Sequence, residues 1–127
     1  MVCVCSAGLL RSPTLARVLS QDPYQCNTRA AGASEEFALI PLDEVLVSWA
    51  EYIIFVSQEV FETASAKNIL TDKECVILEI PDKYAYMDQQ LVTEIKKQLT
   101  DIDFLGVIRS YKEKTPEQRK YTRKEIS

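Results

Sequence analysis

The sequence predicts one α/β domain built on a doubly wound, four-stranded parallel sheet with helices on both faces. Short apolar, β-branched runs alternate along the chain with segments whose apolar residues recur at helical spacing. Such alternation is typical of right-handed βαβ units, which build a parallel sheet covered by helices. The chain has 127 residues, 46% of them hydrophobic, which fits a single domain with a real core.

The first half of the chain supplies two strands and two helices. Residues 2–4 form a short apolar run and predict a buried strand. Ser12-Pro13 predicts a helix start with Ser12 as N-cap, and Asp22-Pro23 ends that helix. Residues 24–31 predict the second strand. A second helix is expected from Pro41, with an inner face made of Leu42, Val45, Leu46 and Trp49.

The second half repeats the pattern. Residues 52–56 are a continuous β-rich run, so they predict a central strand. Ser57 is expected to cap a helix, and residues 75–78 predict the fourth strand. A tyrosine-rich loop at 81–88 leads to a long helix, which Asp88 is expected to cap. The apolar residues of that helix at core-facing positions are Leu91, Ile95, Leu99 and Ile102.

The C-terminal segment 109–127 differs in charge from residues 1–108, which we expect to form the α/β domain. It holds seven basic and three acidic residues, a net charge of +4, against −8 for residues 1–108. Residues 115–118 have the pattern of a helix start. The segment is therefore a basic tail, either a short solvated helix on the domain or a mobile arm.

Composition excludes several classes of function. The net charge of −4 argues against a protein that coats nucleic acid. No apolar run reaches the roughly 18 residues of a membrane span, and no basic segment opens a secretory signal. We therefore expect a cytoplasmic protein whose partners include neither nucleic acid nor membrane.

The chain has four cysteines and no histidine. The missing histidine excludes Ser-His-Asp and Cys-His catalysis and removes the commonest transition-metal ligand. A disulfide framework is the first alternative, but nothing in the sequence indicates a secreted protein. A zinc site is the second, but such a site normally needs two close pairs of cysteines, and Cys26 and Cys75 are far apart in sequence. We expect reduced thiols, no metal and no cofactor.

Residues 5–12, Cys-Ser-Ala-Gly-Leu-Leu-Arg-Ser, are the leading candidate for a site. They join the first strand to the first helix, where ligands bind in folds of this class. The backbone N–H groups of such a loop can converge on an anion, and Arg11 can fork onto two phosphate oxygens. The expected phosphate-binding residues are Ser6, Ala7, Gly8, Leu9, Leu10, Arg11 and Ser12.

Cys5 is the expected nucleophile of this loop. The helix N-terminus, the loop amides and Arg11 all favour a thiolate, so no histidine is needed to activate it. Ser12 can donate a hydrogen bond to that thiolate, and Gly8 permits the positive φ of a tight bend. The alternative is an ordinary buried cysteine at a strand end beside a surface arginine.

With this loop, the sequence resembles the low-molecular-weight protein tyrosine phosphatase family, which places Cys-x5-Arg-Ser after its first strand. Residues 2–19, Arg29-Ala-Ala-Gly32 and residues 46–57 follow the family pattern, and residues 80–88 resemble a smaller bacterial branch of predicted tyrosine phosphatases. The resemblance covers residues 1–108. It implies a four-stranded doubly wound fold. It also implies hydrolysis of phosphotyrosine in proteins, or of small aryl phosphates, through a cysteinyl-phosphate.

The resemblance also implies a general acid in the late loop. The family carries Asp-Pro-Tyr there, and Asp82-Lys83-Tyr84 keeps the Asp and the Tyr. Asp82 is therefore the expected acid, and Asp88 is the second choice because it reads as a helix cap. Tyr84 and Tyr86 are expected to line the substrate cleft, although loop aromatics often only pack the loop.

Three departures from the family pattern keep other functions open. Gly8 stands where the best-known members have a bracing Asn, Leu10 stands where they have a second Cys, and the segment after Ala33 is short. An arsenate reductase on the same fold would need further relay cysteines, and only Cys75 lies in the relevant region. A non-catalytic phosphate-binding or phosphotyrosine-binding adaptor is the other alternative.

Overall fold

The computed structural model describes residues 1–6, 10–34, 36, 38–70, 73–113 and 124–125. Its sheet is parallel throughout, in the order β2-β1-β3-β4-β5. The four main strands are β1 (Val2–Cys5), β2 (Arg29–Gly32), β3 (Tyr52–Phe55) and β4 (Glu74–Ile77). The predicted single-domain fold on four parallel strands is confirmed. The two-residue strand β5 (Lys124–Glu125) is an addition that the sequence reading did not foresee.

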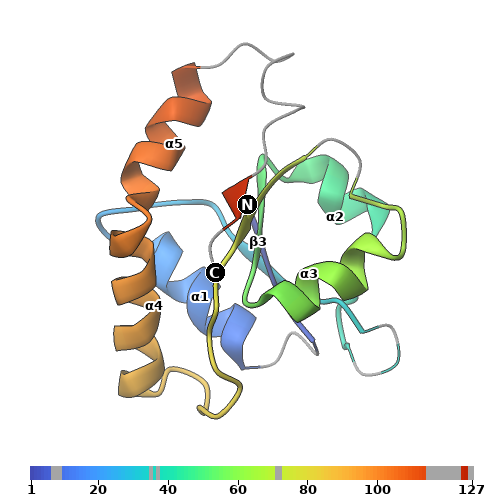
Figure 1. Ribbon diagram of the computed structural model, residues 1–127, viewed down its shortest axis with the longest axis horizontal. Coiled ribbons are helices and arrows are strands. Elements are labelled where there is room, and N and C mark those ends of the chain that lie inside the picture. The colour runs from blue at the N-terminus through green and yellow to red at the C-terminus, as the bar shows by residue number, and fades with distance from the viewer. Residues whose placement is uncertain (7–9, 35, 37, 71–72, 114–123, 126–127) are drawn as a thin grey trace.

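Helices cover both faces of the sheet, as predicted. Figure 1 shows α1 (Arg11–Ser20), α4 (Gln89–Asp101) and α5 (Phe104–Glu113) on one side. The other side carries α2 (Glu44–Trp49) and α3 (Gln58–Ser65). Both β1 and β3 have a strand on each side and helices above and below, so every residue of the two strands is buried. Their uninterrupted apolar sequence follows from that position.

Two N-caps are found where the sequence placed them. The Ser57 hydroxyl accepts a hydrogen bond from the Val60 N–H at 3.3 Å, at the start of α3. The Asp88 carboxylate accepts from the Gln90 N–H at 2.8 Å, at the start of α4. Both side chains satisfy backbone donors that a helix leaves without intrahelical partners.

The predicted cap at Ser12 is wrong. Helix α1 begins two residues earlier, at Arg11 rather than Pro13, with Leu10 in the N-cap position. The Ser12 hydroxyl instead contacts the Cys5 thiol and the Ala31 carbonyl. Pro13 therefore occupies the third helical position, where its missing N–H costs nothing because the first turn has no intrahelical acceptors.

The inner face predicted for the second helix is wrong in part. Helix α2 starts at Glu44 rather than at Pro41, because the Asp43 carboxylate caps it through the Leu46 N–H at 2.9 Å. That start leaves Val45 75% exposed, and Trp49 is also exposed. Strand β2 is shorter than predicted as well, since it begins only at Arg29.

Helix α5 continues the domain across the boundary drawn after residue 108. Phe104 is buried, and its ring lies 5.9 Å from that of Tyr24 and 6.3 Å from that of Tyr52. The Tyr52 hydroxyl also donates to the Val107 carbonyl at 2.8 Å. The helix start expected at residues 115–118 lies outside the described residues. Among the helices the structure describes, none is both long and apolar enough to cross a bilayer.

Candidate active site

Two of the predicted site residues, Cys5 and Arg11, lie where β1 ends and α1 begins. Cys5 is the last residue of β1, and Arg11 is the first residue of α1. The segment after β2 lies alongside, because the Ala33 N–H donates to the Cys5 carbonyl at 2.8 Å and the Ser34 N–H to the Ser6 carbonyl at 2.9 Å. Ala7, Gly8 and Leu9, three of the predicted phosphate-binding residues, lie outside the described residues.

Cys5 and Ser12 form a buried pair. Their Sγ and Oγ atoms are 3.2 Å apart, and the Ser12 hydroxyl is also 3.3 Å from the Ala31 carbonyl. A serine hydroxyl carries one hydrogen and two lone pairs. It can therefore accept from a Cys5 thiol while donating to Ala31, or turn and donate to a Cys5 thiolate. Ser12 thus suits both protonation states of the sulfur.

Arg11 is buried, with 7% of its surface exposed. Its Nη1 donates to the Ile80 carbonyl at 3.0 Å, and its Nε lies 3.5 Å from Oδ1 of Asp82. These two contacts use two of the five N–H donors of a guanidinium. The remaining donors can fork onto the oxygens of a tetrahedral anion.

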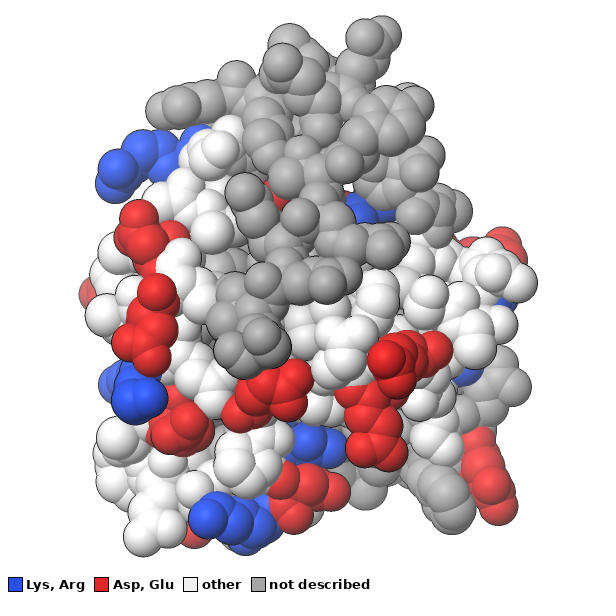
Figure 2. Space-filling view, in the orientation of Figure 1, with Lys and Arg blue, Asp and Glu red and all other residues white. Residues whose placement is uncertain are grey.

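Positive potential gathers at this end of β1. The N-terminal end of α1 carries the positive pole of the helix dipole, and no acidic residue stands in its first turn to offset it. Together with Arg11, this pole favours a bound anion at the start of α1. Figure 2 shows Asp and Glu spread more widely than Lys and Arg over the described part of the face that it presents.

The other cysteines have different surroundings. Cys3 is fully buried in β1, and burial raises the pKa of its thiol, so it stays protonated at neutral pH. Cys75 is likewise fully buried in β4, where a relay thiol would be out of reach. All four cysteines belong to the described residues, and no disulfide joins any of them.

Asp82 and Asp88, the two candidate acids, have distinct roles in the structure. Asp82 is paired with Arg11, and its side chain is 68% exposed, so solvent and substrate can reach it. Asp88 is committed to the backbone at the start of α4. Tyr84 packs partly against the core beneath the Lys83 ammonium, while Tyr86 is 52% exposed.

Three further groups contribute to the arrangement and were not found from the sequence. The Ile80 carbonyl anchors Arg11, but a backbone acceptor leaves no trace in side-chain identity. Thr14 and Gln98 hold the loop that carries Asp82. Thr14 is a polar residue on a buried helix face, and its place there is a weak indication in the sequence of a hydrogen-bonding role. In the described part of the chain, no three metal-binding side chains are clustered.

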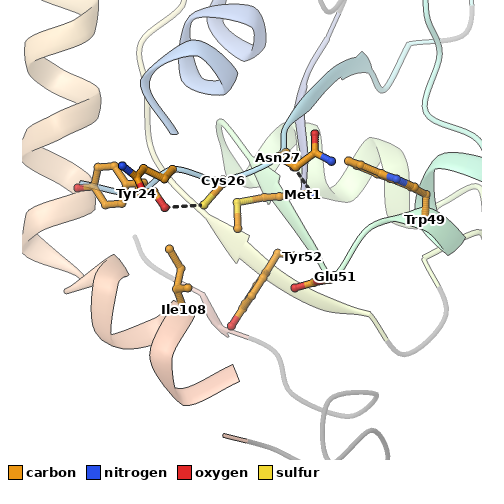
Figure 3. A pocket seen from close by; sticks show the side chains of 9 residues that line it. Met1, Tyr24, Cys26, Asn27, Trp49, Glu51, Tyr52 and Ile108 are labelled. Carbon is orange, nitrogen blue, oxygen red and sulfur yellow. Dashed lines mark hydrogen bonds between the residues drawn. The ribbon is translucent and has the colours of Figure 1, made fainter. Parts of the chain in front are cut away.

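A separate cavity of about 270 Å³ opens at the other end of the sheet (Figure 3). Aromatic side chains and Glu51 line it, and Met1 reaches into it from just before β1. Met1 and Cys5 are four strand residues apart, or about 13 Å. This cavity is therefore distinct from the pair of Cys5 and Arg11.

A thiol, a guanidinium and an exposed carboxylate at one helix N-terminus can hold a phosphate, attack it and protonate a leaving group. Comparisons of the chain with protein-family models, with curated proteins and with solved structures give no match. The functional assignment therefore depends on the motif and on the geometry described above.

Proposed function

We propose that this protein is a cysteine-dependent phosphatase. It hydrolyses phosphotyrosine in proteins or small aryl phosphate monoesters, and it is a divergent relative of the low-molecular-weight tyrosine phosphatases. One observation carries the proposal. Cys5 lies 3.2 Å from Ser12, and Arg11, the residue before Ser12, lies 3.5 Å from Asp82. The expected nucleophile, phosphate ligand and acid thus each belong to the first turn of α1 or contact it. A reducing cytoplasm would keep the Cys5 thiol available.

The first half-reaction transfers the phosphoryl group to sulfur. Arg11 and the helix N-terminus hold the phosphate oxygens while the Cys5 thiolate attacks phosphorus. An S–P bond forms, the P–O bond to the aryl group breaks, and Asp82 gives its proton to the departing oxygen. The products of this step are a phenol and a cysteinyl-phosphate, with Asp82 left as a carboxylate.

The second half-reaction returns the enzyme to its starting state. Asp82, now a base, takes a proton from water as the water oxygen attacks phosphorus. The S–P bond breaks, inorganic phosphate leaves, and Cys5 is again a thiolate that Ser12 can stabilise by donating a hydrogen bond. Two displacements replace one more difficult step, and the chain's own side chains supply every group. An exposed ring such as Tyr86 can stack on an aryl substrate.

The two aspartates give a direct test of the acid. We expect Asp82→Asn to lower kcat/KM for phenyl phosphate, which reports phosphoryl transfer to Cys5, by about 10²- to 10⁴-fold, because that leaving group needs a proton. The loss should be much smaller for para-nitrophenyl phosphate, whose leaving group is stable as an anion. Asp88→Asn should leave both rates near wild type and change only the melting temperature. Steady-state kinetics on both substrates decide the matter, and the reverse ranking of the two variants would overturn the choice of Asp82.

A further inference from the structure

The loop that carries Asp82 is fastened at both ends by side chains from other elements. It runs from the end of β4 to the start of α4. Near its beginning, the Ile80 N–H donates to the Val56 carbonyl at 2.8 Å, which prolongs the pairing of β4 with β3 by one step. The loop leaves the sheet only after that point.

Gln98 of α4 fastens the beginning of the loop from the other side. Since neighbouring residues of an extended chain face opposite edges, the backbone groups of Glu79 point away from β3. The Gln98 amide meets both of them: its Oε1 accepts from the Glu79 N–H at 2.8 Å, and its Nε2 donates to the Glu79 carbonyl at 2.6 Å. The same Nε2 donates to Glu94 at 2.8 Å, which fixes the rotamer of Gln98.

Thr14 of α1 fastens the end of the loop. Its hydroxyl accepts from the Met87 N–H at 2.9 Å and donates to the Leu10 carbonyl at 2.8 Å. Thr14 is fully buried, and Met87 has a φ of 58°, a left-handed conformation that a non-glycine residue holds only when its surroundings fix it. One hydroxyl thus joins the loop to the last residue before α1.

Both ends of the loop therefore rest on one turn of α1. Arg11 and Thr14 are three residues apart and lie on the same helix face. Arg11 binds the Ile80 carbonyl and Thr14 binds the Met87 N–H. The segment from Ile80 to Met87, which contains Asp82, Tyr84 and Tyr86, is therefore held at both ends by that turn. The exposed Asp82 carboxylate forms an ion pair with Arg11, and an ion pair at an exposed position is by itself a weak restraint.

We propose that Thr14 and Gln98 are positioning residues that keep Asp82 at the distance from the phosphate loop needed for proton transfer. The inference rests on the proposed phosphatase function and adds to it. Neither side chain touches the reacting atoms. Their loss should therefore leave attack by Cys5 intact and weaken protonation of the leaving group.

The test compares Thr14→Val, Thr14→Ser and Thr63→Val. Valine keeps the shape of threonine and removes the hydroxyl, whereas serine keeps the hydroxyl. Thr63 is the matched control, since its hydroxyl donates to the carbonyl four residues earlier in α3, as that of Thr14 does at Leu10, but at an exposed position. We expect Thr14→Val to lower kcat/KM for phenyl phosphate by about 10- to 100-fold, the cost of a misplacement near 1 Å. The loss on para-nitrophenyl phosphate should be several-fold smaller, and Thr14→Ser and Thr63→Val should stay near wild type.

Gln98→Met is a second, independent variant. It keeps the length of the side chain and removes the amide, and Lys96→Met on the exposed face of the same helix is its control. Gln98→Met should lose more activity on phenyl phosphate than on para-nitrophenyl phosphate, as Thr14→Val does, and Lys96→Met should show no such difference. If Thr14→Val fails to fold by circular dichroism, Gln98→Met decides the outcome.

A double-mutant cycle with Asp82→Asn separates positioning from general damage. Once the acid is gone, Thr14→Val and Gln98→Met should cost little more on phenyl phosphate. Equal losses on both substrates, full additivity with Asp82→Asn, or unchanged kinetics would each overturn the positioning role. Full activity in Cys5→Ser would instead overturn the phosphatase mechanism itself, so the two failures are distinguishable.

Discussion

Replacing Cys5 by serine should abolish hydrolysis of para-nitrophenyl phosphate while the protein stays folded. Serine has nearly the same shape but is a far weaker nucleophile at neutral pH, and no histidine exists in the chain to activate it. We expect a loss on the order of 10⁴- to 10⁶-fold in kcat, the range seen when one member of a catalytic set is removed. Steady-state turnover at neutral pH measures it.

Cys3→Ser is the matched control for this variant. Cys3 lies two residues earlier in the same strand, is fully buried, and has a thiol whose pKa is raised by that burial. Its replacement should lower the melting temperature and leave kcat within a few-fold of wild type. Retained turnover in Cys5→Ser, or equal losses in the two variants, would contradict a nucleophilic role for Cys5.

Replacing Arg11 by lysine should have the second largest effect. Lysine keeps the charge, but an ammonium cannot place two parallel N–H bonds on a phosphate, and it cannot reproduce the contacts to both Ile80 and Asp82. We expect kcat to fall by about 10²- to 10³-fold, as for the loss of a donor to developing charge. Binding of inorganic phosphate as a competitive inhibitor should weaken as well.

Arg17→Lys controls for the substitution itself, because Arg17 lies on the same helix and is exposed. Its kinetics should match those of wild type. An Arg11→Lys enzyme with a raised KM and unchanged kcat would show that Arg11 contributes equally to ground state and transition state, against the role proposed here.

The order of elements was predictable from sequence because the two central strands, β1 and β3, are continuous apolar runs. Residues 52–55 are all buried, so both faces of this strand are apolar and the run can be recognised without a polar–apolar alternation. Helix α2 was harder, since it has six residues and Asp43 overrides the start that Pro41 suggested. The predicted boundary after residue 108 followed the basic charge of residues 109–127, but α5 runs on to Glu113, and Phe104 and Val107 attach its first turn to the core.

Site residues that are close together in sequence could be predicted, whereas contacts between residues far apart in sequence could not. Cys5 and Ser12 are seven residues apart in sequence, and their side chains lie 3.2 Å apart. The contacts of Arg11 with Ile80 and of Thr14 with Met87 join positions some seventy residues apart. They involve backbone groups, which carry no side-chain signature, so only the fold reveals them.

Trapping the phosphoenzyme tests the central claim most directly. In Asp82→Asn, para-nitrophenyl phosphate should still phosphorylate Cys5, because its leaving group needs little help, while hydrolysis of the intermediate slows for lack of a base. Rapid quenching should give a burst of about one p-nitrophenolate per enzyme and a phosphoryl group on the peptide that contains Cys5. Turnover without a burst, or a phosphoryl group on any other residue, would contradict the cysteinyl-phosphate mechanism.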